Sequence, residues 1–161
     1  MTFSIIFLII FLFVFIYRFY LKDFIDVTIV YKSLRKVLES RDLLVLKLLP
    51  DIQDKKLSES VLRLINERNR KSKISYDDAI RADLELHRKL KILYEQINKM
   101  KKNEVQEELF RRIIDLEKRL KLLRTRYSAT VRAYNMSLTI HPKIFVKILH
   151  MKPLDLYGKK E

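Results

Sequence analysis

The sequence predicts an all-α fold, in which an N-terminal transmembrane helix is followed by an antiparallel up-and-down bundle of long helices. Three observations lead to this prediction. The 161 residues include one glycine and three prolines, too few for the repeated turns of an all-β fold. Leu, Ile, Lys, Arg and Glu dominate the remainder, which is typical of long helices. Apolar residues also recur at steps of three and four through the second half of the chain.

The first element is an uncharged apolar segment. No charged side chain occurs from Met1 to Tyr17, and after Arg18 the apolar run continues to Leu21. Roughly 20 apolar residues span the hydrocarbon core of a bilayer, provided that Arg18 reaches the interface. Because no basic residue precedes the run and no A-x-A-like site follows it, we expect a retained single-pass anchor over residues 1–21. A cleaved signal peptide and a buried soluble helix are the alternatives.

Basic residues flank this segment on its C-terminal side only. None precedes it, whereas Arg18, Lys22, Lys32, Arg35 and Lys36 follow it. The positive-inside rule then predicts an external N-terminus and a cytoplasmic C-terminal domain at the cell (inner) membrane. The same residues would lie against the anionic lipid of the inner leaflet.

The first two helices after the anchor are delimited by a proline and a polar stretch. Neither glycine nor proline occurs from Leu21 to Leu49, so the anchor is expected to continue into the first bundle helix, which Pro50 ends. The polar stretch 66–75 is expected to be a loop, and Ser75 to cap the next helix. Between these breaks a second helix is indicated by Leu57, Val61, Leu62 and Ile65.

The third and fourth helices carry the clearest periodicity. Apolar residues from Ala79 to Met100 predict the third helix, which ends in the polar stretch 99–104. The stripe of the fourth helix has 4-3-4-3-4 spacing, typical of a helix packed on a neighbour, and Pro142 ends or kinks it. Its members are Leu109, Ile113, Leu116, Leu120, Leu123 and Tyr127, and then Val131, Tyr134 and Leu138.

The expected organisation is one bundle domain over residues 22–150, between the anchor of residues 1–21 and a C-terminal tail of residues 151–161. A chain of 161 residues is too short for two independent cores. Short connections between long helices favour antiparallel neighbours. An extended coiled-coil dimer is the alternative architecture.

Signatures of catalysis and ligand binding are missing from the sequence. Without cysteine no disulfide or thiolate site exists, and with Gly158 as the only glycine no phosphate-binding loop can form. Asp83 and His87 are one helical turn apart, but di-metal bundles use E-x-x-H motifs, which the chain lacks. We therefore expect a surface pair there, and predict no catalytic, cofactor-binding or metal-ligating residue and no enzyme.

The formal net charge is +14, which favours anionic partners such as lipid headgroups, nucleic acid or an acidic protein. Lys and Arg are spread along the whole soluble part instead of forming one block. Solvated helix faces with an excess of lysine are the alternative explanation of this charge.

A more specific pattern lies near the C-terminus. It comprises Glu117, Arg124, Tyr127, Val131, Tyr134, Asn135 and Pro142. This pattern resembles the C-terminal signature of the LemA family, and the stretch around Leu38, Arg41, Leu44 and Leu48 is similar to the family's basic, Leu-rich first helix. The chain departs from the signature at Ser128, at His141 and at His150, as a diverged member would.

The resemblance implies a membrane-anchored helical bundle with an external N-terminus, a large cytoplasmic domain and no established catalytic activity. Because Tyr127 and Tyr134 are seven residues apart, they share a helix face. We expect both tyrosines, with Asn135 bonded to the backbone at the Pro142 turn, to lock the last long helix to its neighbours. The alternative is that they line a groove for a partner.

The predicted function is that of a non-enzymatic single-pass membrane protein with a basic helical-bundle interaction domain. Its expected partners are membrane or envelope proteins, with anionic lipid at the cytoplasmic face, and a homo-oligomer is left open. A membrane-tethered nucleic-acid-binding protein is the alternative, because the charge of +14 suits a polyanion.

Overall fold

The structure is a computed structural model that describes residues 2–72, 75–140, 146–147 and 151–157, and only the backbone of residues 2–4, 16 and 19–21. Within these ranges the regular elements are all helical, which confirms the all-α prediction. They are α1 (Thr2–Leu48), the short 3-10 helix η1 (Leu49–Asp51), α2 (Lys55–Lys71), α3 (Tyr76–Lys99) and α4 (Glu104–Ile140).

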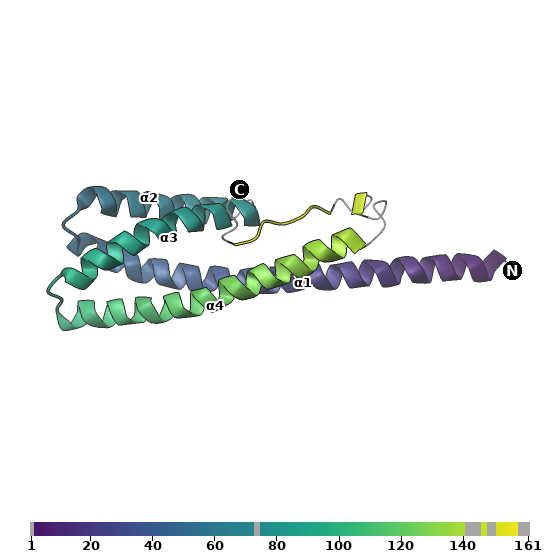
Figure 1. The fold of residues 1–161 in the computed structure, drawn as a ribbon, viewed down its shortest axis with the longest axis horizontal. Coiled ribbons are helices and arrows are strands. Elements are labelled where there is room, and N and C mark those ends of the chain that lie inside the picture. Colours follow the sequence, from purple (N-terminus) through teal and green to yellow (C-terminus); the bar gives the residue numbers. More distant parts are fainter. Residues whose placement is uncertain (1, 73–74, 141–145, 148–150, 158–161) are drawn as a thin grey trace.

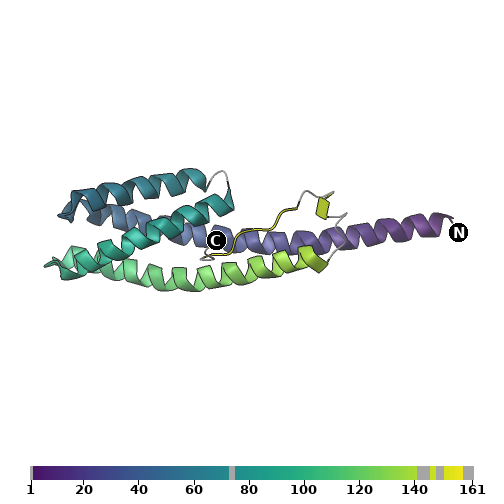
Figure 2. The same cartoon turned by 45° about the horizontal axis from the view of Figure 1, so that its top comes forward.

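The four long helices alternate in direction along the bundle (Figure 1). Helices α1 and α3 run one way, and α2 and α4 return, so that consecutive helices are antiparallel. The main contacts join α1 to α4 and α2 to α3. The N-terminal part of α1 extends beyond the other helices in both views (Figures 1 and 2).

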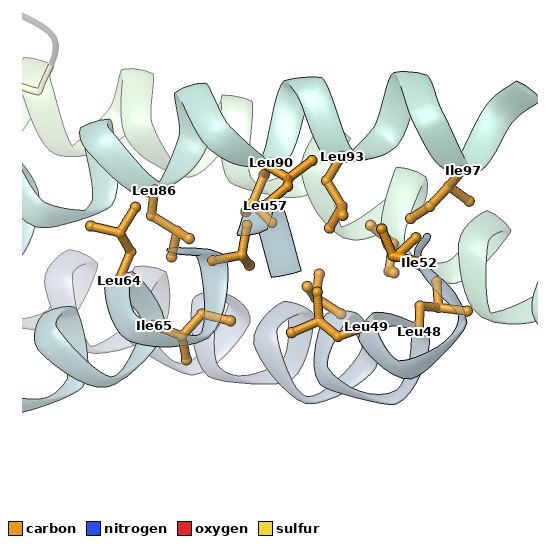
Figure 3. Packing of buried hydrophobic residues seen from close by; sticks show 13 residues of the cluster. Leu48, Leu49, Ile52, Leu57, Leu64, Ile65, Leu86, Leu90, Leu93 and Ile97 are labelled. Carbon is orange, nitrogen blue, oxygen red and sulfur yellow. The ribbon is translucent and has the colours of Figure 1, made fainter. Parts of the chain in front are cut away.

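Two apolar clusters hold the helices together. One joins α1 and α4 through residues such as Val27, Leu34, Tyr127 and Val131, all with no exposed surface. The other fills the end of the bundle near η1, where side chains of α2 and α3 point toward one another (Figure 3). Its buried members on α3 are Leu86, Leu90, Leu93 and Ile97, at the steps of three and four that the sequence predicts.

The helix boundaries agree with the sequence at Pro50, at the Ser75 cap and in the polar stretch 99–104, whereas the break predicted at Pro142 lies outside the described residues. Pro50 lies in η1, where α1 ends, and Ser75 caps α3 by accepting a hydrogen bond of 3.4 Å from the Asp78 N–H. Residues 100–103 separate α3 from α4.

The loop predicted over residues 66–75 is wrong in its first part, because α2 continues to Lys71. Residues 66–71 contain no glycine or proline, and a Glu67–Lys71 ion pair of 2.7 Å supports the last turn. On this helix Leu62 is 43% exposed, and Leu64 occupies the buried face instead. A polar composition alone therefore did not end the helix.

The N-terminal segment has an extended apolar surface. Every side chain from Ile5 to Phe15 is between 43% and 74% exposed. Among the described residues, however, no helix combines the length and the apolar character needed to cross a bilayer. The structure therefore does not confirm the transmembrane helix predicted over residues 1–21. Helix α1 passes through the predicted boundary at residues 21 and 22 without a break.

Candidate functional site: a buried ion network

Charged side chains from all four long helices meet inside the bundle. Helix α1 supplies two of them, α2 one, α3 one and α4 two. Their side chains are between 0% and 15% exposed, and we call them the ion network. Its members are Arg41, Asp42, Arg68, Asp83, Glu117 and Arg124.

Arg41 lies at the centre of the ion network, with no exposed side-chain surface. Its Nη2 donates to Asp42 Oδ1 at 2.9 Å and to Asp83 Oδ1 at 3.1 Å, and its Nη1 donates to Glu117 Oε1 at 3.2 Å. The third nitrogen, Nε, also donates to Asp42 Oδ1, at 3.1 Å. Burial alone would lower the pKa of this guanidinium, but the three carboxylates raise it. Arg41 is therefore firmly charged.

Asp83 is the carboxylate that faces all three arginines. Its oxygens lie 3.1 Å from Arg41, 3.0 Å from Arg124 and 3.6 Å from Arg68. Burial would raise the pKa of Asp83, but these guanidiniums outweigh it and hold the pKa below the ordinary value. Asp83 is thus an ionised carboxylate on α3 that joins α1, α2 and α4.

Asp42 completes the inner part of the ion network. Its Oδ2 lies 2.7 Å from Arg68 Nη2, which also donates to Asn69 Oδ1 at 2.7 Å. Burial raises the pKa of Asp42 above its ordinary value, against the opposing effect of Arg41 and Arg68. Three arginines face three carboxylates, so the formal charges cancel, and this lowers the cost of burying them.

Glu117 lies at the more exposed edge of the ion network. Its Oε1 accepts from Arg41 and, at 3.2 Å, from the Tyr94 hydroxyl, and its Oε2 lies 3.6 Å from Arg124. Burial raises the pKa of Tyr94, which keeps its hydroxyl protonated and able to donate. Glu117 Oε2 also lies 3.8 Å from Nδ1 of His87, whose side chain is 42% exposed.

The expected surface pair of Asp83 and His87 is wrong. Asp83 is 1% exposed and pairs with arginines, whereas His87 faces Glu117. Burial, with the nearby Arg124 charge, lowers the pKa of His87. The spacing of four residues between Asp83 and His87 therefore does not make them an ion pair. The partners of Asp83 come from other helices.

An extended C-terminal segment, Met151–Tyr157, follows the second half of α4 and ends beside the N-terminal end of α3, and we call it the strap (Figure 1). The Asn135 side chain clamps its backbone, because Nδ2 donates to Leu154 O at 2.8 Å and Oδ1 accepts from Leu154 N at 2.9 Å. Asp155 forms an ion pair of 2.7 Å with Arg81. The strap ends against the ion network, where the Tyr157 hydroxyl hydrogen-bonds to Asp83.

Two residues of the α4 signature contact the strap. Asn135 holds the backbone of Leu154. The predicted bond to the Pro142 turn lies outside the described residues. The Tyr134 hydroxyl donates to the carbonyl of Lys152 at 3.3 Å. These two signature residues thus join α4 to the strap.

The other signature residues of α4 divide between the apolar core and the ion network. Tyr127 and Val131 have no exposed surface, and the Tyr127 ring lies 6.1 Å from that of Tyr31. Within the described ranges the Tyr127 hydroxyl has no hydrogen-bond partner, and burial raises its pKa. Glu117 and Arg124 lie in the ion network, and Arg124 also covers the Tyr157 ring, 5.0 Å from its centre.

The sequence reasoning missed Asp42, Arg68 and Asp83 as site residues. A signal was present, since Asp83 follows Ala79 by four residues and precedes Leu86 by three, a position on the apolar face of α3. A charge at such a position is rarely buried unless it is paired. The identity of its partners required the three-dimensional arrangement.

These features define an all-helical up-and-down bundle whose helices are joined by a buried ion network and a C-terminal strap. The sequence model of the LemA family matches residues 34–161, about four-fifths of the chain. The chain therefore belongs to the LemA family, as its C-terminal pattern predicts, and the matched range includes the whole ion network and the strap. Comparisons with curated proteins and with solved structures find no match.

Proposed function

We propose that this LemA-family chain is a non-enzymatic single-pass membrane protein whose basic helical bundle is an interaction module. The observation that carries the proposal is the exposed apolar surface of α1 from Ile5 to Phe15. Exposed apolar area costs about 25 cal/mol per Å² in water, and a contiguous patch of this kind marks a site of membrane or protein contact. Insertion into lipid removes that cost.

The charge distribution supports a cytoplasmic bundle at the cell membrane. Basic residues follow the apolar segment and none precedes it, and by the positive-inside rule this supports an N-terminus outside. Lys22 is exposed directly after the apolar segment, where it would lie at the anionic headgroups, and Lys32 and Lys36 are exposed further along α1.

The ion network suits a structural role inside the bundle, and not catalysis. Its carboxylates are ion-paired to arginines, so their charge is used within the bundle. Asp83 pairs with arginines of α1, α2 and α4. Glu117 on α4 contacts Arg41 of α1 and Tyr94 of α3, so both carboxylates have a structural task. We propose that the outer surface of the bundle meets the partners, among them membrane proteins and anionic lipid.

Membrane insertion is tested by fractionation of matched charge variants. Phe11→Lys places a charge in the apolar segment and is expected to release the chain from alkaline-washed membranes. The control Leu43→Lys alters an exposed residue of the same helix within the bundle, 62% exposed, and should stay with the membranes. Retention of Phe11→Lys in the membrane fraction would contradict the anchor.

Topology is tested with an impermeant maleimide on intact cells, because the chain contains no cysteine. Thr2→Cys is expected to react and Lys160→Cys to react only after permeabilisation. Reaction of Lys160→Cys in intact cells would overturn the orientation. Binding to duplex DNA that falls steeply with salt and survives competition by anionic vesicles would favour the nucleic-acid alternative instead.

A further inference from the structure

Helix α4 carries a second apolar face, opposite the one that it buries in the bundle. Its large side chains are Leu122, 72% exposed, Met136, 64% exposed, and Ile140, 70% exposed. Between them lie exposed small residues at steps of three and four, so that together they follow one side of the helix for about 27 Å. This outer face of α4 comprises Leu122, Thr125, Ala129, Ala133, Met136 and Ile140.

Unpaired basic side chains flank this outer face. Arg119 and Arg126 lie along one edge and Lys121 and Arg132 along the other, by their spacing on the helix. All four are exposed, and none forms an ion pair with a residue that the structure describes. The sequence has no acidic residue between Glu117 and Asp155 that could neutralise them.

In α4 up to residue 118, by contrast, the exposed basic residues are ion-paired. Arg111 pairs with Glu107 at 3.9 Å, Arg112 with Glu108 at 2.7 Å and Lys118 with Asp115 at 3.2 Å. Helix α4 therefore pairs its exposed basic residues with carboxylates up to residue 118. Its later exposed basic residues have no such partner among the described residues. The uncompensated charges coincide with the apolar outer face, so that both features select a partner at the same place.

The side chains of the outer face of α4 favour one of three candidate partners: a second copy of the chain, lipid, or a helix of another protein. A second copy of the chain would bring like charges together, which is destabilising. Insertion into lipid favours bulky apolar side chains, whereas Ala129 and Ala133 occupy the middle of this face. Small residues there let the backbone of another helix approach closely. The flanking arginines and lysine then require carboxylates on that helix.

We propose that the outer face of α4 binds an amphipathic helix of a partner protein, with an apolar stripe flanked by Asp and Glu. This inference rests on the proposed interaction function and names its surface and the class of its partner. Leu122 and Ile140 contact the ends of the partner's stripe. Its central apolar side chains pack over Ala129 and Ala133. The carboxylates on its two edges pair with Arg126 and Arg132.

The test measures binding of a synthetic peptide to the full chain in neutral detergent micelles by fluorescence anisotropy. The peptide is a helix as long as the outer face, with leucines at helical spacing and glutamates on both flanks. A second peptide carries lysine in place of every glutamate. The glutamate peptide is expected to bind, with an affinity that falls as salt rises, and the lysine peptide is not.

Two variants and one matched control locate the site. Arg126→Glu with Arg132→Glu is expected to weaken the glutamate peptide at least about tenfold, and Ala129→Tyr to weaken it similarly by blocking the close approach. The control Arg111→Glu with Arg112→Glu makes the same change of charge on the same helix and should leave binding within about twofold.

Three results would overturn the inference. They are no binding of the glutamate peptide at low salt, equal losses in the variant and the control, or a wild-type dimer in light scattering that Ala129→Tyr dissociates. If the peptide fails while the chain still fractionates with membranes, only the surface assignment falls. If the peptide binds while the chain does not fractionate with membranes, the membrane part of the proposed function falls and the α4 surface stands.

Discussion

At the scale of single residues, Asp83 is the member of the ion network that pairs with all three other long helices. It lies on α3 and contacts arginines from α1, α2 and α4, at 3.1, 3.6 and 3.0 Å. A buried ion pair can be no more stabilising than a well-packed apolar cluster, but removal of one partner leaves a charge buried without compensation. The ion network thus favours one arrangement of the four helices over others that bury the same apolar surface.

Asp83→Asn is expected to lower the free energy of unfolding by about 3–5 kcal/mol, because Arg41 and Arg124 then lose a buried partner charge. Urea unfolding of the full chain in detergent, followed by circular dichroism, measures the change. Asp115→Asn is the control, since its pair with Lys118 is 61% and 74% exposed and contributes at most about 1 kcal/mol. Equal losses in both variants would contradict a special role for Asp83.

The depressed pKa of Asp83 also predicts a pH dependence. In the unfolded chain an aspartate has a pKa of about 3.9, and in the bundle the arginines hold it lower. Its contribution is therefore complete above the unfolded pKa and is lost as the pH falls toward the folded pKa. Below about pH 5, the free energy of unfolding of the native chain should fall more steeply than that of Asp83→Asn. Parallel curves would count against an ionised Asp83.

At the scale of elements, the strap is the part that secondary-structure reasoning does not reach. It forms no regular element, and it is fixed by side chains of α3 and α4, among them Arg81, Asn135 and Ser128. Its apolar residues Leu154, Leu156 and Tyr157 pack on the cluster between α1 and α4. The strap therefore covers the bundle on the side where the ion network would otherwise be more open to water.

Asn135→Ala removes both hydrogen bonds to the Leu154 backbone and is expected to destabilise the bundle by about 1–3 kcal/mol. Hydrogen exchange should then become faster at the amide of Leu154 while that of Val131 stays protected. Asn66→Ala, on the exposed face of α2, is the control and should change neither quantity. If Asn135→Ala loses partner binding while stability and hydrogen exchange stay unchanged, Asn135 lines a groove for a partner and does not lock α4 to its neighbours.

Much of the helical arrangement follows from local patterns, whereas the ion network does not. The stripe from Ile113 to Leu138 and the break at Pro50 are local properties of the sequence, and both are present in the structure. The sequence predicts the end of α2 too early, because its polar residues 66–71 continue the helix. Asp83 finds its partners 41 and 42 residues away, at Arg124 and Arg41, and no periodicity within α3 contains that information.

At the scale of the whole molecule, α1 forms the long axis. Its 47 residues correspond to about 70 Å at a rise of 1.5 Å per residue. The bundle packs on its C-terminal half and leaves the N-terminal end projecting (Figure 2). The apolar segment and the ion network therefore belong to one uninterrupted helix.

Spin labels at Tyr17→Cys and Leu43→Cys test this continuity, because both positions are exposed on α1 and the chain has no other cysteine. We expect a narrow distance distribution near about 39 Å, since 26 residues separate the labels. The pair Lys22→Cys and Leu43→Cys is the control, with about 32 Å expected. If only the first pair gives a broad, shorter distribution, α1 bends near residues 21 and 22.

Because α1 is continuous, the number of its residues fixes how the bundle is rotated about the α1 axis relative to the apolar segment. Each residue rotates a helix by about 100°, so the number of residues between the apolar segment and the bundle sets the direction in which the outer face of α4 looks. One inserted residue after Lys22 would swing that face about a quarter turn around the axis of α1, whereas four would return it to within about 40°. The length of this helix thus sets the direction of the outer face of α4 in the plane of a membrane. That direction determines which neighbouring protein α4 would contact.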